Sequence, residues 1–496
     1  MHLVWFKRDL RVDDHCLLAD VGRACRAGEQ MLGVYVYEPI VYQADDFDVC
    51  HLYFINESLV ELRASLRKIG GELLILHGEI LRVFEQVRRH FGVSKLWSHE
   101  ENGNSITFDR DLRVAQWVKK NGIQWVEKPQ NGVIRRLKNR DGWATLWTKR
   151  MLLEVFDPPD LLVSPASRFC GEVLAAAELE LNDRPMVDRQ RGGSERAWQC
   201  FESFIGGRGE SYRSAMSSPV TAYEACSRLS PYLAFGNISV KQVFQRVCVM
   251  QLAIKNSEAP RGTFTQWRAS LKSFQSRLRW HCHFIQKMED QPDIDTVNIA
   301  RSYDGIRGED AAKLEAWRDG QTGYSMIDAC MRALRATGWL NFRMRAMVMS
   351  FASYHLWIDW RASGLVLARY FVDYEPGIHW SQVQMQSGTT GINSVRVYSP
   401  IKQVTDQDPD GTFIRKWVPE LANVPNAYLA EPHTMPVMEQ TFAGCRIGDD
   451  YPEPIVNHTE AYRLARDKIH SIRKSNGARI EATAVYRKHG SRRKKG

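Results

Sequence analysis

The spacing of apolar residues changes along the chain, and this change constrains the fold more than any other feature of the sequence. Up to about residue 130, apolar segments of four to seven residues alternate with longer stretches of helical period. Segments this short that are rich in Val, Ile, Leu, Trp and Tyr predict buried parallel strands. With helices between them, such as Tyr53–Ile69, they predict an open, doubly wound α/β domain. The predicted strands are His2–Phe6, Met31–Tyr37, Leu73–His77, Lys95–His99 and Gln124–Glu127.

The remainder of the chain predicts a second domain that is all-helical. The pattern weakens over residues 131–195, which are rich in proline and indicate an inter-domain connection. The helical period then dominates, and the predicted helices include Lys241–Gln251, Trp267–Lys287, Ser325–Thr337 and Asn341–Trp360. We therefore expect an α/β domain over 1–130, a connection over 131–195, an all-α domain over 196–480 and a basic tail over 481–496.

The sequence also disfavours several classes of protein. The first strand is followed by Lys7-Arg8-Asp9-Leu10-Arg11, not by the GxGxxG of an NAD-binding domain. No apolar run reaches membrane-spanning length and no secretory signal precedes Lys7, so we expect a cytoplasmic monomer without a membrane partner. The ten cysteines show no CxxC spacing, which favours free thiols. An iron–sulfur site built from Cys200, Cys226, Cys248 and Cys282 is the alternative.

The positive charge of the chain is concentrated at its C-terminal end. The formal net charge is +9, yet Arg463–Gly496 alone contains twelve Lys or Arg against Asp467 and Glu481. The rest of the chain is therefore close to neutral, and the high pI does not by itself indicate a basic groove. Such a tail, ending in Arg492–Lys495, is either a solvated extension or an arm that binds phosphates.

A series of sequence segments points to one known family. The segments are His2–Asp14, Arg228–Gly236, Thr322–Asp328 with Met331-Arg332, Thr337–Trp339, Ile358–Arg361, Arg396–Pro400 and Phe413–Leu421. In this order they resemble the DNA photolyase/cryptochrome family, in a divergent bacterial-type form, over residues 2 to about 460. The resemblance implies an all-α C-terminal domain that binds FAD and uses blue light to move an electron.

The resemblance also implies which residues hold FAD. Those expected around the phosphates and the ribityl chain are Tyr212, Ser227, Arg228, Leu229 and Ser230, since a diphosphate needs hydroxyl and backbone donors and a fixed cation. Arg345 and Asp373 match an ion pair beside the reactive edge of the flavin, and Tyr374 and Glu375 belong to the same segment. No metal site is expected.

An electron path to the flavin is implied in the same way. Trp360 matches the middle tryptophan of the family's relay, and Trp380 is the candidate next to the flavin. The usual outer position holds Arg307 instead of tryptophan, which puts a relay to the surface in doubt. Tyr303 or Trp357 could take its place.

Substrate recognition departs from the family pattern. Trp280 matches the residue that stacks on a flipped pyrimidine dimer, but Arg277 stands where a carboxylic acid is expected. Arginine can donate a forked hydrogen bond to a carbonyl, but it does not release a proton. Phe342 replaces an asparagine, whereas Arg343 and Gln403 keep identities that face DNA.

Two functions follow from these features. The first is an enzyme, a deoxyribodipyrimidine photo-lyase that repairs UV-damaged DNA by electron transfer from reduced FAD. The second is a cryptochrome-type photoreceptor with flavin photoreduction but no repair, which Arg277, Phe342 and Arg307 favour. A second antenna chromophore, a folate or a deazaflavin, is possible near the loop after the first strand and near His99–Gly103.

Overall fold

The computed structural model describes residues 1–166 and 169–490, and its N-terminal part is built on one parallel sheet. The strands are β1 (His2–Trp5), β2 (Met31–Tyr37), β3 (Leu73–His77), β4 (Lys95–His99) and β5 (Gln124–Lys128). Their order is β3-β2-β1-β4-β5, with every neighbouring pair parallel. The predicted doubly wound fold is confirmed, and the chain direction across the sheet reverses beside β1, where open sheets bind ligands.

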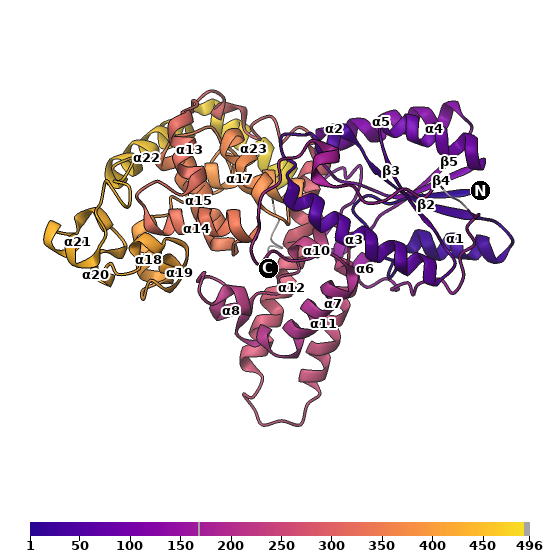
Figure 1. The fold of residues 1–496 in the computed structure, drawn as a ribbon, viewed down its shortest axis with the longest axis horizontal. Coiled ribbons are helices and arrows are strands. Elements are labelled where there is room, and N and C mark those ends of the chain that lie inside the picture. Colours follow the sequence, from indigo (N-terminus) through magenta and orange to yellow (C-terminus); the bar gives the residue numbers. More distant parts are fainter. Residues whose placement is uncertain (167–168, 491–496) are drawn as a thin grey trace.

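Helices cover both faces of this sheet (Figure 1). One face carries α1 (Cys16–Arg26) and α3 (Val49–Lys68), and the other carries α4 (Ile80–Phe91) and α5 (Ser105–Lys120). The alternation of side chains along β1 explains the arrangement. Val4 belongs to the core that includes α1 and α3, and Leu3 and Trp5 belong to the core that includes α4 and α5.

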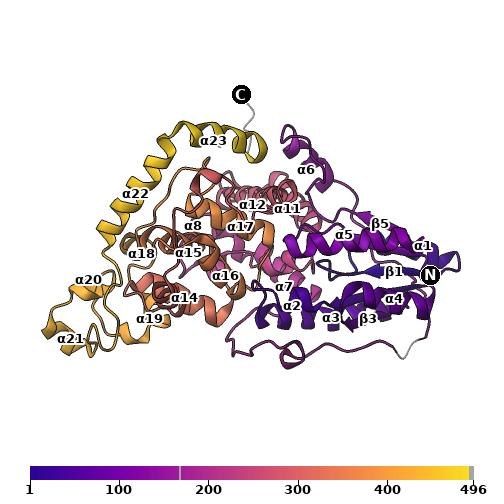
Figure 2. The same cartoon turned by 90° about the horizontal axis from the view of Figure 1, so that it is seen from above.

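From residue 194 onward the described chain is built from helices and the loops between them, which confirms the predicted all-α C-terminal part. After α6 (Trp143–Met151), an irregular connection returns along the α/β domain (Figure 2) and meets the sheet where the amide of Met31 donates to the carbonyl of Val163 (2.8 Å). The remaining helices are α2 (Pro39–Tyr42), α7 (Ser194–Gly206), α8 (Tyr212–Ala215), α9 (Ala222–Ala225), α10 (Ser230–Ala234), α11 (Val240–Lys255), α12 (Thr265–Asp290), α13 (Ala311–Asp319), α14 (Ser325–Thr337), α15 (Phe342–Ser350), α16 (Trp360–Tyr370), α17 (Pro376–Ser387), α18 (Pro400–Gln407), α19 (Thr412–Trp417), α20 (Asn426–Leu429), α21 (Val437–Ala443), α22 (His458–Lys474) and α23 (Asn476–His489).

The prediction of a single helix over Asn341–Trp360 is wrong. Helix α15 ends at Ser350, residues 351–355 form one π-helical turn, and α16 begins only at Trp360. The buried guanidinium of Arg307 donates to the carbonyl of Ser353 (2.7 Å), and Trp357 has a left-handed backbone (φ 57°) that a continuous helix cannot contain. The long-range contact of Arg307 therefore breaks a segment whose local pattern is helical.

The C-terminal segment also differs from the expectation of a solvated basic extension. Helix α23 crosses the predicted boundary at residue 481 and lies with α22 along the outside of the helical domain (Figure 2). Glu481 accepts hydrogen bonds from the amides of Arg301 and Ser302, and buried His489 pairs with Gln291 (2.9 Å). The tail is thus docked through His489, and Arg492–Lys495 lie outside the described residues.

The two parts of the molecule meet where the loop after β1 packs on α10. The amide of Leu10 donates to the carbonyl of Phe235 (3.1 Å), and Arg11 donates to the carbonyl of Gly236 (2.9 Å). Gly236 has φ +72°, and a Cβ there would lie 2.2 Å from the carbonyl oxygen of Arg8. This contact therefore requires glycine.

The described residues contain no helix that is both long enough and apolar enough to cross a membrane. All ten cysteines are free thiols, and within the described ranges no three of them gather as an iron–sulfur cluster would require.

Candidate functional site

A cavity of ≈ 510 Å³ lies in the helical domain, bordered by α8, α10, α12, α15 and α17. It brings together segments that are far apart in the sequence, and all but three of the predicted site residues line it. Trp360, Trp380 and Gln403 are not part of the lining. The predicted residues in the lining are Tyr212, Ser227, Arg228, Leu229, Ser230, Arg277, Trp280, Arg343, Arg345, Asp373, Tyr374 and Glu375.

Arg228 is a buried cation in the wall of the cavity. Its guanidinium carbon lies 4.0 Å from the ring centres of both Tyr223 and Trp339, and its Nε donates to Gln190 (3.1 Å). Among the described residues, Nη1 and Nη2 have no hydrogen-bond acceptor. Burial lowers the pKa of Arg228, because the charged form is poorly solvated there. An anion in the cavity would supply the two missing acceptors.

The predicted ion pair between Arg345 and Asp373 is present. Nη1 and Nη2 of Arg345 donate to the two carboxylate oxygens of Asp373 at 2.9 and 2.7 Å, which is the forked geometry. The carboxylate side chain is 3% exposed and the arginine side chain 26%. Arg345 is further fixed by its Nε bond to the carbonyl of Leu340 (2.7 Å) and by the ring of Phe371, 3.9 Å from its guanidinium. The pair thus forms a rigid polar part of the wall.

The α/β domain contributes partners to the same wall. Arg8, from the loop after β1, donates to Glu375 (2.9 Å) and to the carbonyl of Tyr374 (2.9 Å). The hydroxyl of Tyr374 donates to Asp46 (2.5 Å), which follows α2. Burial raises the pKa of Glu375, while Arg8 opposes that rise. Glu375 therefore joins the two domains, a role that the sequence did not predict.

Trp380 and Trp360 lie behind the lining of the cavity and in contact with each other. Their ring centres are 5.7 Å apart at an interplanar angle of 67°. The indole of Trp380 donates to the hydroxyl of Tyr374 (3.0 Å), and that of Trp360 donates to Asn298 (2.6 Å). Both indoles are buried, so the pair forms a continuous aromatic contact leading away from the cavity wall.

The exposed part of the lining marks the opening of the cavity. Trp280 is 39% exposed and Phe342 45% exposed. The guanidinium of Arg277 lies 4.9 Å from the ring centre of Phe342, so the two positions that depart from the family pattern contact each other. Arg343 lines the same cavity, whereas Gln403, on α18, is buried outside the lining.

A second, smaller cavity of ≈ 90 Å³ lies at the carboxyl ends of the strands. The loop after β1 contributes Lys7 and Arg8, and the segment after β4 contributes Glu101 and Gly103. Both segments that the sequence singled out for an antenna chromophore thus meet there. Tyr374 of the helical domain closes the cavity on its other side.

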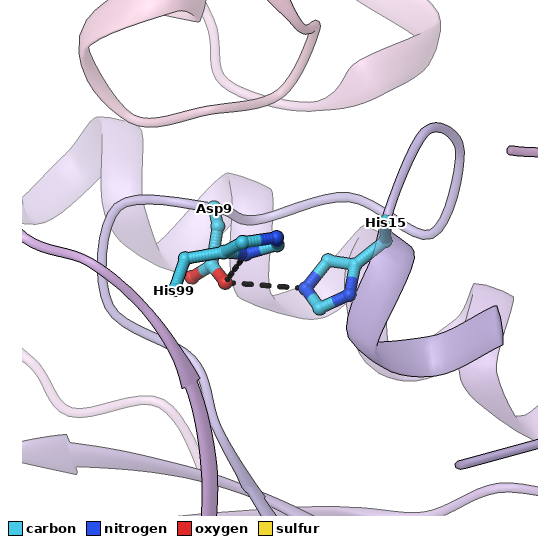
Figure 3. A group of neighbouring side chains, drawn as sticks. All are labelled: Asp9, His15 and His99. Carbon is cyan, nitrogen blue, oxygen red and sulfur yellow. Dashed lines mark hydrogen bonds and ion pairs between the residues drawn. The ribbon is translucent and has the colours of Figure 1, made fainter. Parts of the chain in front are cut away.

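A buried cluster of Asp9, His15 and His99 lies behind this loop (Figure 3). One oxygen of Asp9 pairs with Nε2 of His15 (3.1 Å) and with Nδ1 of His99 (2.7 Å). Nδ1 of His15 accepts from the amide of Leu18 (3.2 Å), so His15 must hold its proton on Nε2 and donate to Asp9. These hydrogen bonds use both nitrogens of His15 and favour a structural role over metal binding.

Comparison with known proteins agrees with this geometry. A family model described as DNA photolyase matches residues 2–139, and one described as the FAD binding domain of DNA photolyase matches residues 274–471. Together the two matches cover more than half of the chain. This chain belongs to the DNA photolyase/cryptochrome family.

Relatives in both branches of the photolyase/cryptochrome family are similar to this chain. It is 26% identical over 480 residues to the deoxyribodipyrimidine photo-lyase of Alkalihalophilus pseudofirmus, which covers 93% of this chain and 96% of that protein. It is also 26% identical over 484 residues to cryptochrome DASH of Gloeobacter violaceus, covering 92% and 93%. The solved archaeal photolyase of Sulfolobus tokodaii matches with a TM-score of 0.75 at 25% identity, over 95% of this chain and 100% of that chain.

The cofactor of the family's helical domain is FAD, and the residues of the large cavity fit it. The unpaired Nη groups of Arg228 suit a diphosphate, and the adjoining serines suit its oxygens. Elsewhere in the lining, the amide of Gln382 and Oδ1 of Asn341 are buried without a partner among the described residues. A polar ring edge would satisfy such groups.

A second chromophore is also consistent with the family. The archaeal photolyase is described as holding two FAD molecules, with the implication of a novel light-harvesting cofactor.

Sequence reasoning missed several residues of the large cavity. Asn341, His379, Gln382 and Gln386 all line it. Gln382 and Gln386 are one helical turn apart on α17, and His379 is one turn before Gln382, so a polar stripe on a predicted helix was the available signal. Burial lowers the pKa of His379 to about 4, and this imidazole is therefore neutral near pH 7.

Proposed function

We propose that this chain is a light-driven photolyase that binds UV-damaged DNA at the opening of the large cavity. The observation that supports this most is the exposed indole of Trp280 in the lining of a cavity built for FAD. When bound and reduced, FAD supplies the light-driven electron. The protein must then place the damaged dinucleotide against the cofactor and exclude water from it.

Each residue at the opening has a proposed role in holding the lesion. Trp280 offers an apolar face for a flipped pyrimidine dimer to stack on. Arg277 donates two hydrogen bonds to pyrimidine carbonyls and keeps its proton, so it stabilises developing negative charge by its own positive charge. Arg343 pairs with a backbone phosphate. Gln403 is proposed to reach DNA only if α18 moves, because it is buried and outside the lining.

Residues of the cavity wall have proposed roles toward the flavin. Arg228, with Ser227, Leu229, Ser230 and Tyr212 beside it, holds the phosphates and ribityl chain. The Arg345–Asp373 pair fixes the electrostatic potential at the reactive edge of the ring, because both groups are locked by hydrogen bonds.

The second candidate function is a cryptochrome-type photoreceptor. One observation favours it: Arg277 and Phe342 contact each other at the opening of the cavity. If this contact persists when DNA is present, the two side chains occupy the position that a lesion needs, and the light chemistry would serve signalling instead.

Illumination of the reduced, FAD-loaded protein with an oligonucleotide that contains one thymine dimer separates the two functions. Repair predicts that intact thymines are recovered, as measured by chromatography of the digested strand. Trp280→Ala should abolish the preference of the protein for dimer-containing over intact DNA, whereas Tyr462→Ala, on the distant helix α22, should not. Absence of restored thymine together with equal binding of both oligonucleotides would support the photoreceptor.

A further inference from the structure

Tyr374 lies in the wall between the two cavities of the molecule. Its side chain lines the ≈ 510 Å³ cavity of the helical domain and also the ≈ 90 Å³ cavity at the carboxyl ends of the strands. It follows the ion-pair residue Asp373 in sequence, and its phenol is buried. The phenol therefore contacts the indole of Trp380 behind the lining and Asp46 of the α/β domain.

A directed chain of hydrogen bonds passes through this phenol. The indole of Trp380 can only donate, so its 3.0 Å bond makes the Tyr374 oxygen the acceptor. The phenol proton is then directed to Oδ2 of Asp46 at 2.5 Å. The same oxygen of Asp46 accepts from the side-chain amide of Asn104 (2.9 Å), which holds the carboxylate in place. The chain therefore ends at a base that belongs to the α/β domain.

The other groups around the phenol do not compete for its proton. The rings of His51 and His379 have their centres 5.8 and 5.1 Å from that of Tyr374, and each pairs with a backbone carbonyl. Arg8 donates to the carbonyl of Tyr374. Burial raises the pKa of Tyr374, and the charge of Asp46 raises it further, so the phenol keeps its proton until it is oxidised.

The direction beyond Trp360 is less favourable for a positive hole. Trp360 donates to the amide oxygen of Asn298 (2.6 Å), which is not a base, so an oxidised Trp360 would stay a buried cation. The guanidinium of Arg361 lies 4.4 Å from the Trp360 ring. Buried Arg307 stands at the usual outer relay position, where its charge opposes a second positive charge.

We propose that Tyr374 is the redox-active end of the electron path and that Asp46 is its proton acceptor. One electron passes from Tyr374, which lines the cavity, to the light-excited oxidised flavin. The phenolic O–H bond breaks, and the same proton forms an O–H bond on Asp46. A neutral phenoxyl radical and a neutral carboxylic acid then replace the phenol and the carboxylate, and no uncompensated charge remains at the pair. The proposal rests on the binding of FAD and is independent of whether the protein repairs DNA.

The test uses the FAD-loaded oxidised protein without DNA, produced with ring-deuterated or ordinary tyrosine and trapped after a laser flash for electron paramagnetic resonance. We expect a tyrosyl radical whose hyperfine splitting collapses on deuteration. Tyr374→Phe and Asp46→Asn should both lose this signal, leave a tryptophanyl radical and shorten the lifetime of the charge-separated state. Tyr303→Phe is the matched control, because Tyr303 is a buried phenol with no carboxylate partner among the described residues, and it should keep the signal.

Several outcomes would overturn the proposal. These are a wild-type protein with only a tryptophanyl radical, a tyrosyl signal that survives in Tyr374→Phe, and a signal lost in Tyr303→Phe but retained in Tyr374→Phe. If Tyr374→Phe fails to bind FAD, as its absorption spectrum would reveal, Asp46→Asn decides, since it keeps the phenol and removes only the base. In wild type the appearance of the radical should slow in D₂O, and an unchanged rate would also contradict the coupled proton transfer.

Discussion

Arg228 provides a test of cofactor binding that separates a binding role from a structural one. Two of its nitrogens are buried without an acceptor, so an anion that pairs with both would gain two charge-assisted hydrogen bonds. At about 1.5–3 kcal/mol for each such bond, Arg228→Met should cost about 3–6 kcal/mol of binding free energy. The affinity for FAD, measured by fluorescence titration of the flavin-free protein, should therefore fall by about 10²–10⁴-fold.

The same substitution should barely affect the flavin-free protein. Removing a buried charge whose two Nη groups lack an acceptor relieves its desolvation, and this gain opposes the loss of the hydrogen bond to Gln190 and of the contacts with Tyr223 and Trp339. The free energy of unfolding, measured in urea, should change by no more than about 1 kcal/mol.

Arg208 is the matched control for this experiment. It supports the same segment, but its guanidinium is bonded to protein carbonyls, among them those of Ser227 (3.0 Å) and Cys200 (2.9 Å). Arg208→Met should therefore destabilise the flavin-free protein by about 2–4 kcal/mol. The reasoning is refuted if Arg228→Met binds FAD as tightly as wild type, or if it destabilises the flavin-free protein as strongly as Arg208→Met does.

Three further predictions concern stability. Asp373→Asn removes the charge that pairs with Arg345, and the free energy of unfolding measured in urea should fall by about 1–3 kcal/mol. A fall of less than about 0.5 kcal/mol would show that solvent screens the pair. Gly236→Ala should lower the free energy of unfolding by about 2–4 kcal/mol, because the added Cβ meets the carbonyl of Arg8, and an undisturbed midpoint would contradict the close approach. Burial lowers the pKa of His355 from 6.5 to about 3, so the unfolded state takes up a proton on this residue before the folded state does. The contribution of His355 to the free energy of unfolding is therefore fully present above pH 6.5 and is lost as the pH falls toward 3. His355→Phe should therefore reduce the slope of stability between pH 6 and 4 by up to about 1.4 kcal/mol per pH unit, and equal slopes for both proteins would refute the assignment.

Local pattern predicted the α/β domain well and the helical boundaries less well. The strands came out within one residue of their observed ends, because short apolar segments between helices have few other solutions. The break after Ser350 could not be predicted, since it depends on Arg307, which is far away in sequence. Likewise, α23 has a basic composition typical of a solvated tail, and its docking depends on Glu481 meeting the amides of Arg301 and Ser302.

The site, like the fold, was predictable where it depends on local sequence and not where it depends on contacts between distant segments. Composition and periodicity alone predicted no flavin, and the residues of the cavity were found through the resemblance of several ordered segments. The resemblance placed Arg345 with Asp373, and the structure has that pair. It did not place Arg8 or Asp46 at the wall, because these residues come from the other domain and their partners are set by how the two domains pack.

The bonds from Arg8 to Glu375 and from Asp46 to Tyr374 have a consequence for engineering. Two residues in the wall of the large cavity, Glu375 and Tyr374, take these partners from the α/β domain, so that domain cannot be exchanged as an independent module. A chimera that carries the first 130 residues of a relative would fold its sheet. It would still leave Glu375 and Tyr374 without Arg8 and Asp46, unless these two residues were kept in the chimera.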